Sequence, residues 1–140
     1  MKKFIKSVFL FLMVAVVAVT ASGCISSDYT KVKEKLEKAE YSVTETTNDL
    51  AISGACVGLA AMGVEVDDSK IVCIMSAVKD DAGIQLYFCE DSATAKSLEE
   101  QFKEIFDELK EEAEEDEDFK LGRNGKVVYY GNEQAIKDAR

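Results

Sequence analysis

The sequence predicts an α+β fold in which a mainly antiparallel sheet of four to five strands packs against helices. Segments with helical periodicity alternate along the chain with segments rich in β-branched and aromatic residues. Two pairs of the latter are separated only by short turns, the connection that joins antiparallel strands. The chain beyond residue 23 is long enough for one domain with its own core, which we place at residues 29–140.

The first predicted elements are a helix and a strand. Apolar residues recur at the spacing of one helix face at Tyr29, Val32, Leu36 and Ala39. Glu34 and Lys38 add an i,i+4 ion pair to this helix. Residues 41–47 are rich in β-formers and predict the first strand.

Residues 50–64 carry no charge and are rich in Gly and Ala. Two structures fit this segment: a small-residue helix packed on a sheet, or a pair of strands. We favour the helix. Gly54 and Gly58 lower helix stability by about 1 kcal/mol each relative to Ala, but they permit close backbone approach. With a helix here, the order from residue 41 is β-α-β-β-α-β, as in ferredoxin-like sandwiches, with an added N-terminal helix and a C-terminal hairpin and helix.

A central hairpin follows. Residues 71–78 form a continuous apolar run, residues 80–83 read as a turn, and residues 84–89 read as a returning strand. This hairpin supplies the middle of the predicted sheet.

The register of this hairpin decides where two cysteines lie. In a type I turn followed by a bulge, Asp80 faces Ile84, and Cys73 and Cys89 become diagonal neighbours on one face. Such neighbours lie about 7–8 Å apart, whereas a disulfide needs Cα atoms within roughly 4.4–6.8 Å, so we predict free thiols. A four-residue loop would instead pair Lys79 with Ile84 and place the cysteines on opposite faces.

A long helix is predicted next, capped by Asp91 or Ser92. Its apolar stripe consists of Ala95, Leu98, Phe102, Ile105, Phe106 and Leu109. We expect the core to join Val72, Ile74, Val78, Leu86 and Phe88 of the sheet to Leu98, Phe102, Ile105 and Leu109 of this helix. The opposite sheet face then needs a cover, either residues 50–62 or a partner protein. The many acids near the helix C-terminus oppose the helix dipole and predict fraying from about Glu112.

The C-terminal part reads as a hairpin and a short helix. Asn124 and Gly125 predict a two-residue turn between strands at residues 119–121 and 127–130. We expect Gly131 to end the second strand, and the final helix to carry Ala135 and Ile136.

The N-terminus has the three zones of a secretory signal. Lys2, Lys3 and Lys6 form a cationic region, residues 8–19 an unbroken apolar run, and small residues follow. These 12 apolar residues are fewer than the roughly 20 that cross a bilayer. Residues 1–23 are therefore predicted to be a signal peptide.

The run Ala21-Ser22-Gly23-Cys24 resembles the lipobox of bacterial lipoproteins, although Ala21 stands where that family most often has Leu. The resemblance implies cleavage between Gly23 and Cys24 and acylation of Cys24, whose two acyl chains suffice for stable anchoring. It implies that residues 24–28 form a lipid anchor and a short tether, and that the protein faces the extracytoplasmic side of a bacterial cell membrane. An ordinary secretory signal cut after Ala21 or Gly23 is the alternative.

The charge of the expected mature chain limits its partners. Residues 1–23 hold three of the 17 basic residues and no acid, which leaves 14 bases against 27 acids and a net charge of −13. Nucleic acid needs a basic footprint, so we expect no nucleic-acid partner. An anionic membrane surface is disfavoured for the same reason, and the acyl chains on Cys24 must hold the protein to the membrane.

The chain contains no histidine, which excludes Ser-His-Asp and Cys-His catalysis and His-containing zinc sites. Residues 54–58 match the G-x-C-x-G form of a nucleophile elbow, but the histidine base is missing. Residues 111–118 are acidic yet lack the spacing and glycine of a calcium loop.

We therefore expect a non-catalytic, lipid-anchored domain that acts through protein or ligand contacts. We assign it no catalytic residue, no cofactor and no metal, and its protein partner is unknown. The alternative is a small extracytoplasmic carboxylate-based hydrolase or metal-dependent module. An exposed apolar patch would favour the first hypothesis, and a pocket with two close acids the second.

Overall fold

The structure is a computed structural model that describes residues 25–112 and 119–140. Gly23 and Cys24, the expected cleavage and lipidation sites, lie outside the described residues, as do residues 113–118 of the acidic run. The described chain forms α2 (Tyr29–Lys38), β1 (Ser42–Thr46), α3 (Asp49–Ala61), the 3₁₀ turn η1 (Asp68–Lys70), β2 (Ile71–Lys79), β3 (Ala82–Cys89), α4 (Ser92–Glu112), β4 (Phe119–Asn124), β5 (Val127–Asn132) and α5 (Glu133–Ala139).

The sheet has five strands in the order β1-β2-β3-β5-β4, and every neighbouring pair is antiparallel. The predicted α+β class with an antiparallel sheet is confirmed. The ferredoxin-like arrangement is not confirmed, because β1 and β2, the strands on either side of α3, are adjacent and antiparallel. A split βαβ unit instead leaves space for a third strand between two parallel ones.

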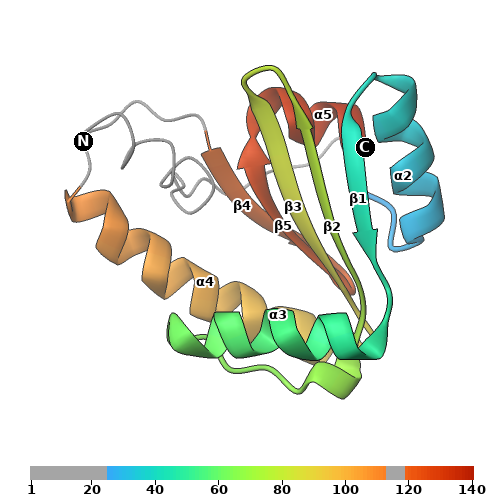
Figure 1. Cartoon of the computed structure of the whole chain (residues 1–140). Helices are drawn as coiled ribbons and strands as arrows, with labels where there is room; N and C mark the ends of the chain where they lie inside the picture. The colour runs from blue at the N-terminus through green and yellow to red at the C-terminus, as the bar shows by residue number, and fades with distance from the viewer. Residues whose placement is uncertain (1–24, 113–118) are drawn as a thin grey trace.

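Helices cover both faces of the sheet, giving three layers (Figure 1). α3 and α4 contribute buried side chains to the core on one face, among them Ile52, Leu98 and Phe102. α2 and α5 contribute to the core on the other face, among them Leu36 and Ile136. Because both faces are covered, the strands can be apolar on both sides, and β3 has no exposed residue.

The helix favoured for the uncharged middle segment is confirmed, since α3 occupies it. The Asn48 side chain caps α3 by accepting hydrogen bonds from the backbone N–H groups of Leu50 and Ala51. At the other end Gly63 has φ +92°, and the N–H of Val64 donates to the carbonyl of Leu59. This is the Schellman closure that ends a helix at a glycine.

The predicted register of the central hairpin is wrong. Lys79 pairs with Ala82 across a two-residue turn, in which Asp80 has a positive φ of 52°. Asp tolerates this conformation, so the turn is shorter than expected. Cys73 and Cys89 consequently lie in the cores on opposite faces of the sheet. Both are free cysteines, as is Cys56.

The predicted core changes with this register. Ile74 packs in the α3–α4 core as expected, but Leu86 and Phe88 pack on the other face, against α2 and α5. Val72 and Val78 are exposed by about two-fifths rather than buried. Relative to the predicted pairing, the partner of each β2 residue moves by three positions; an odd shift exchanges the two faces of β3, which explains the error for Leu86 and Phe88.

The helix phase of α4 is as predicted. Leu98, Phe102 and Phe106 are buried, and Ile105 is partly buried against the same core. The side chain of Leu109 lies outside the described residues. α4 ends at Glu112.

The C-terminal hairpin forms one residue later than predicted. Asn124 pairs with Val127, so Gly125 and Lys126 are the turn residues, and Gly125 has φ +60°. Gly131 does not end the strand but continues it, opposite Ile84. A Cβ at residue 131 would collide with the backbone there, which explains why this position is a glycine.

The first described residue is already part of the core. Ile25 is fully buried, and the Asn124 side chain donates a hydrogen bond of 2.5 Å to its carbonyl oxygen. Val127, the partner of Asn124, pairs in turn with Phe88. Ile25 thus lies at the end of the sheet where β1 finishes and α3 begins.

Candidate functional site

The most unusual surface of the molecule is the outer side of α3. Only Ile52 and Leu59 of this helix are buried in the core. Leu50 is 82% exposed and Val57 is 70% exposed, and residues 50–64 contain no charged side chain. A helix that is apolar all round is normally buried on all sides, but residues 25–112 and 119–140 cover α3 on one side alone.

Part of the exposed surface of α3 forms a defined stripe, and Ala51, Ala55 and Ala60 are exposed to either side of it. At 100° per residue, five positions cluster on the side opposite Ile52 and Leu59. We call this stripe the α3 outer face; it consists of Leu50, Gly54, Val57, Gly58 and Ala61, all of which are exposed. Their spacing of i, i+4, i+7, i+8 and i+11 is the pattern by which one helix packs against another structure.

The two glycines of the α3 outer face have no role in the packing of their own chain. A Cβ added to Gly54 or Gly58 would meet no heavy atom within 4 Å, and neither residue has a positive φ. A glycine inside a helix costs about 1 kcal/mol relative to alanine. The described fold therefore gives no reason for this cost, whereas close approach of another backbone would.

Hydrogen bonds attach α3 and the loop that follows it to neighbouring elements. The Ser53 hydroxyl donates to the Asp68 carboxylate at 2.5 Å, which joins the helix to η1. Beyond its C-terminus, the Gln101 side chain accepts from the N–H of Glu65 at 2.7 Å and donates to the carbonyl of Glu65 at 2.8 Å. These contacts join α3 to η1 and the loop after α3 to α4.

Acidic residues border this face without extending onto it. Asp49, Asp67 and Asp68 are exposed near the ends of α3 and η1. Asp67 accepts from the hydroxyl and the backbone N–H of Ser69, and these bonds lower the pKa of its carboxyl group. The boundary is thus anionic, while the face itself is uncharged.

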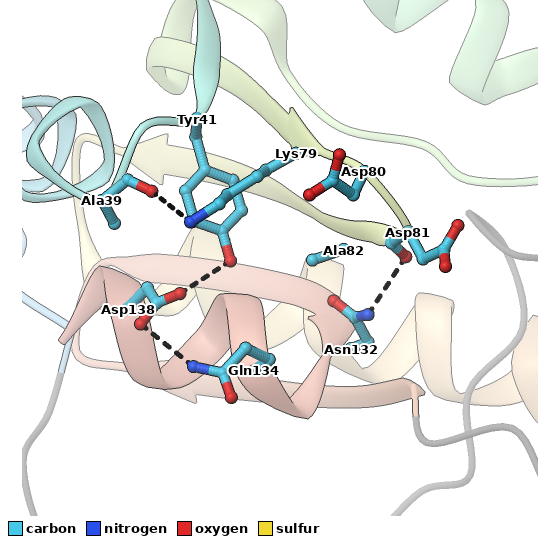
Figure 2. Close-up of a pocket in the computed structure, with 9 residues that line it drawn as sticks. All are labelled: Ala39, Tyr41, Lys79, Asp80, Asp81, Ala82, Asn132, Gln134 and Asp138. Carbon is cyan, nitrogen blue, oxygen red and sulfur yellow. Dashed lines mark hydrogen bonds between the residues drawn. The ribbon is translucent and has the colours of Figure 1, made fainter.

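A second feature is a shallow polar pocket of about 500 Å³ at the opposite end of the sheet (Figure 2). Its lining residues are Ala39, Tyr41, Lys79, Asp80, Asp81, Ala82, Asn132, Gln134 and Asp138. They come from the end of α2, the β2–β3 turn and α5.

The polar groups of the pocket bond mainly to one another. The Tyr41 hydroxyl donates to Asp138 at 2.8 Å, and the Gln134 amide donates to the same carboxylate at 3.1 Å. Lys79 donates to the carbonyl of Ala39 at 2.7 Å and lies 5.6 Å from the centre of the Tyr41 ring. Figure 2 shows the Lys79–Ala39 and Tyr41–Asp138 bonds crossing between elements, which ties α2 and α5 to the sheet, whereas the Gln134–Asp138 bond lies within α5.

The pocket offers hydrogen bonds but no evident reaction. Burial, followed by the bond to Asp138, raises the pKa of Tyr41 far above its ordinary value. The phenol is therefore a donor and not a base at neutral pH. Asn132 donates to the carbonyl of Asp81 at 3.3 Å and accepts from the N–H of Gly83 at 3.0 Å, which holds the turn in place.

The other sequence-predicted candidates are not assembled into a site. Residues 54–58 lie inside α3, so the strand that must precede a nucleophile elbow is absent. Burial raises the pKa of Cys73 and of Cys89 to about 12, which keeps both thiols protonated. Within the described ranges, no group of three Cys, Asp or Glu side chains is arranged to hold a metal ion.

Leu50 and Val57 are the functional candidates that the sequence reasoning missed. The uncharged run and its glycines were visible, but we expected their small side chains to face the sheet. The i, i+4, i+7, i+8 spacing of the stripe was the available signal. Because apolar residues lie on every side of this helix, its amino-acid pattern does not indicate which side faces solvent.

The fold and this surface define a three-layer α+β domain that exposes one side of an apolar helix. No helix in the described part of the chain has the length and apolarity needed to cross a membrane. Comparison with known proteins finds no matching family model, no matching curated protein and no matching solved structure.

Proposed function

We propose that the protein is a lipid-anchored, non-catalytic domain on the extracytoplasmic side of a bacterial cell membrane, and that it binds another protein through the α3 outer face. The exposure of Leu50 and Val57 on an uncharged helix is the observation that carries this proposal. Contiguous exposed apolar surface of this kind is typical of interaction sites.

The shape of the surface favours a protein over a small molecule. Ligand sites are concave, whereas the α3 outer face is the convex side of a helix. Gly54 and Gly58 leave two positions of this face without side chains, where a partner's backbone or side chain can approach closely. A partner helix or strand satisfies this requirement.

The lipid anchor in this proposal rests on the lipobox resemblance at Cys24. Ile25 is buried, so an acylated Cys24 would be joined to the folded domain by a single peptide unit. Consecutive Cα atoms are 3.8 Å apart, which would keep the domain next to the bilayer. Intact-mass analysis of protein extracted from membranes is expected to show acyl mass on an N-terminal Cys24. An unmodified Cys24, or a chain that begins at Ser22, would contradict the anchor.

The contact surface is tested by photo-cross-linking in the full chain within its own membranes. A photoreactive amino acid at position 57 is expected to give a covalent adduct with a protein at a discrete mass. The matched control is position 60, because Ala60 is exposed on the same helix but points about 100° away from the centre of the α3 outer face. Equal adducts at both positions, or none at position 57, would contradict a protein contact through this face.

A further inference from the structure

We infer that the β4–β5 turn is the surface by which this domain faces a lipid bilayer, with Gly125 and Lys126 lying against the phospholipid headgroups. The inference rests on the lipid anchor of the proposed function and adds the side of the domain that the anchor holds to the membrane. It does not depend on which protein binds the α3 outer face.

The β4–β5 turn lies beside the start of the described chain. Ile25 is fully buried, and its carbonyl oxygen accepts a hydrogen bond of 2.5 Å from the Asn124 side chain. Asn124 is the last residue of β4, so Gly125 and Lys126 follow it directly. The residue next to Cys24 is therefore attached to the base of this turn.

The connection between the anchor and this turn is too short for the domain to rotate freely. One peptide unit joins Cys24 to Ile25, and consecutive Cα atoms are 3.8 Å apart. Acyl chains on Cys24 would lie in the hydrocarbon region and hold this residue at the headgroups. Because Ile25 belongs to the folded core, the turn beside it has to lie at the headgroups as well.

The residues that follow Ile25 supply no flexible tether either. The backbone N–H of Asp28 donates to the Ser26 hydroxyl at 3.0 Å. The Asp28 carboxylate accepts from the N–H of Thr30 at 3.0 Å and so caps α2, which begins at Tyr29. The domain can therefore turn away from its anchor only if Ile25 leaves the core.

The exposed charge at this turn suits lipid phosphates. Lys126 is exposed, and within residues 25–112 and 119–140 its ammonium group has no ion-pair partner. Arg123 is already paired with Glu99 at 3.0 Å, and Glu90, which follows β3, is paired with Lys70 at 3.8 Å. Lys126 can therefore donate to a lipid phosphate, an acceptor that gives strong charge-assisted hydrogen bonds.

The opposite end of the sheet supplies a matched reference position. β3 runs over eight residues, Ala82–Cys89, and spans about 26 Å at 3.3 Å per residue. Asp81 lies in the β2–β3 turn before β3, whereas Lys126 lies beyond its other end, where its carbonyl accepts from the N–H of Cys89 at 2.8 Å. Asp81 and Lys126 are both exposed residues of hairpin turns, so they differ mainly in their expected distance from the bilayer.

The test measures this distance on the acylated full-length protein bound to vesicles of phosphatidylcholine that include a lipid with a nitroxide on its headgroup. In a Cys56→Ala background, a fluorophore is attached to Lys126→Cys or, as the control, to Asp81→Cys; Cys73 and Cys89 are buried and do not compete for the label. A nitroxide quenches only fluorophores that lie close to it. We expect quenching at position 126 to be at least about threefold stronger than at position 81, because the length of the sheet separates the two turns.

A second variant tests whether the short connection imposes this orientation. Insertion of 12 Gly and Ser residues between Cys24 and Ile25 keeps the anchor and the domain but adds a flexible chain with an r.m.s. length of about 19 Å. The difference in quenching between positions 126 and 81 should then largely disappear. An undiminished difference would overturn the role assigned to the short connection.

The failure of this inference and the failure of the lipid anchor give different results. Equal quenching at the two positions of a protein whose acyl mass is verified, or stronger quenching at position 81, would overturn the inference and leave the anchor intact. An intact mass that shows an unmodified Cys24 would overturn both.

Discussion

At the scale of single residues, the aromatic side chains of α4 form the centre of one core. Phe102 is 2% exposed, and its ring centre lies 5.3 Å from that of Tyr87, 5.5 Å from that of Tyr130 and 6.0 Å from that of Phe106. Such aromatic pairs add to the stabilisation that burial provides. This residue is therefore a sensitive probe of the α4 phase.

We expect Phe102→Ala to lower the free energy of unfolding by about 3–5 kcal/mol, because it leaves a cavity among three rings. Urea unfolding followed by circular dichroism measures the change. Lys103→Ala, at the adjacent exposed position, is the control and should stay within about 0.5 kcal/mol. A loss below about 1 kcal/mol at Phe102 would mean that the helix is rotated.

The buried thiols predict a specific sensitivity to alkaline pH. Burial raises the pKa of Cys73 and of Cys89 from 9.0 to about 12. Below pH 9 both thiols are protonated in the folded and unfolded states. Between about pH 9 and 12 the unfolded chain loses these protons while the folded chain keeps them, so stability falls by up to about 1.4 kcal/mol per pH unit for each thiol.

Urea unfolding at several pH values tests this expectation. Tyr41, Tyr87 and Tyr130 also have raised pKa values and add to the loss above pH 10, so the informative quantity is a difference between variants. The double variant of Cys73→Ala and Cys89→Ala should start from a lower stability but decline less steeply from pH 9. Parallel curves for the two proteins would show that the buried thiols ionise in the folded state.

At the scale of elements, the sequence predicted where helices and strands lie far better than how they face each other. Periodicity, β-rich composition and turn residues located α2, α4 and the five strands to within a few residues, whereas α3 was only the favoured of two alternatives and α5 was given no bounds. The register depended on one turn, which has two residues, with a positive φ at Asp80, rather than the expected type I turn with a bulge. That difference exchanged the faces of the strand, so Leu86 and Phe88 were assigned to the wrong core.

The orientation of α3 could not be predicted for a different reason. An amphipathic helix shows its buried side through its apolar stripe, as α4 does with Leu98 and Phe102. α3 has apolar residues on every side, so burial of Ile52 and Leu59 is decided by tertiary packing. The sequence therefore marks residues 50–64 as an unusual segment, but it does not show which side of the helix is exposed.

The exposed glycines of α3 predict that the isolated domain can be stabilised easily. Gly54→Ala and Gly58→Ala place a methyl group in open space, and each should raise the free energy of unfolding by about 1 kcal/mol. Gly63→Ala is the matched control. It also enters open space, but the φ of +92° makes alanine strained there, and a loss of about 1 kcal/mol is expected. Denaturant unfolding at low protein concentration measures all three, and destabilisation by the helix variants would show that these glycines serve the fold itself.

At the scale of the whole molecule, the two ends of the sheet differ in character. One end holds the Tyr41–Asp138 pocket, whose hydrogen bonds join α5 to the sheet. The other holds Ile25, the β4–β5 turn and the start of α3. An anchor at Cys24 would attach this second end to the membrane, and the polar pocket would face away from it.

The net charge gives the last prediction, because it separates a lipid anchor from electrostatic binding. With −13 on the chain from residue 24 onward, an anionic bilayer repels the domain, and removing the anchor should release it. Gly23→Ala combined with Cys24→Ser turns the lipobox into an ordinary A-x-A cleavage site. This double variant should move to the soluble extracytoplasmic fraction, whereas the unaltered protein should stay with membranes in high salt. If the double variant stays membrane-bound after verified cleavage, apolar contact rather than acylation holds the domain at the membrane. Adding Val57→Asp should then release it, because this substitution puts a charge on the most apolar exposed surface.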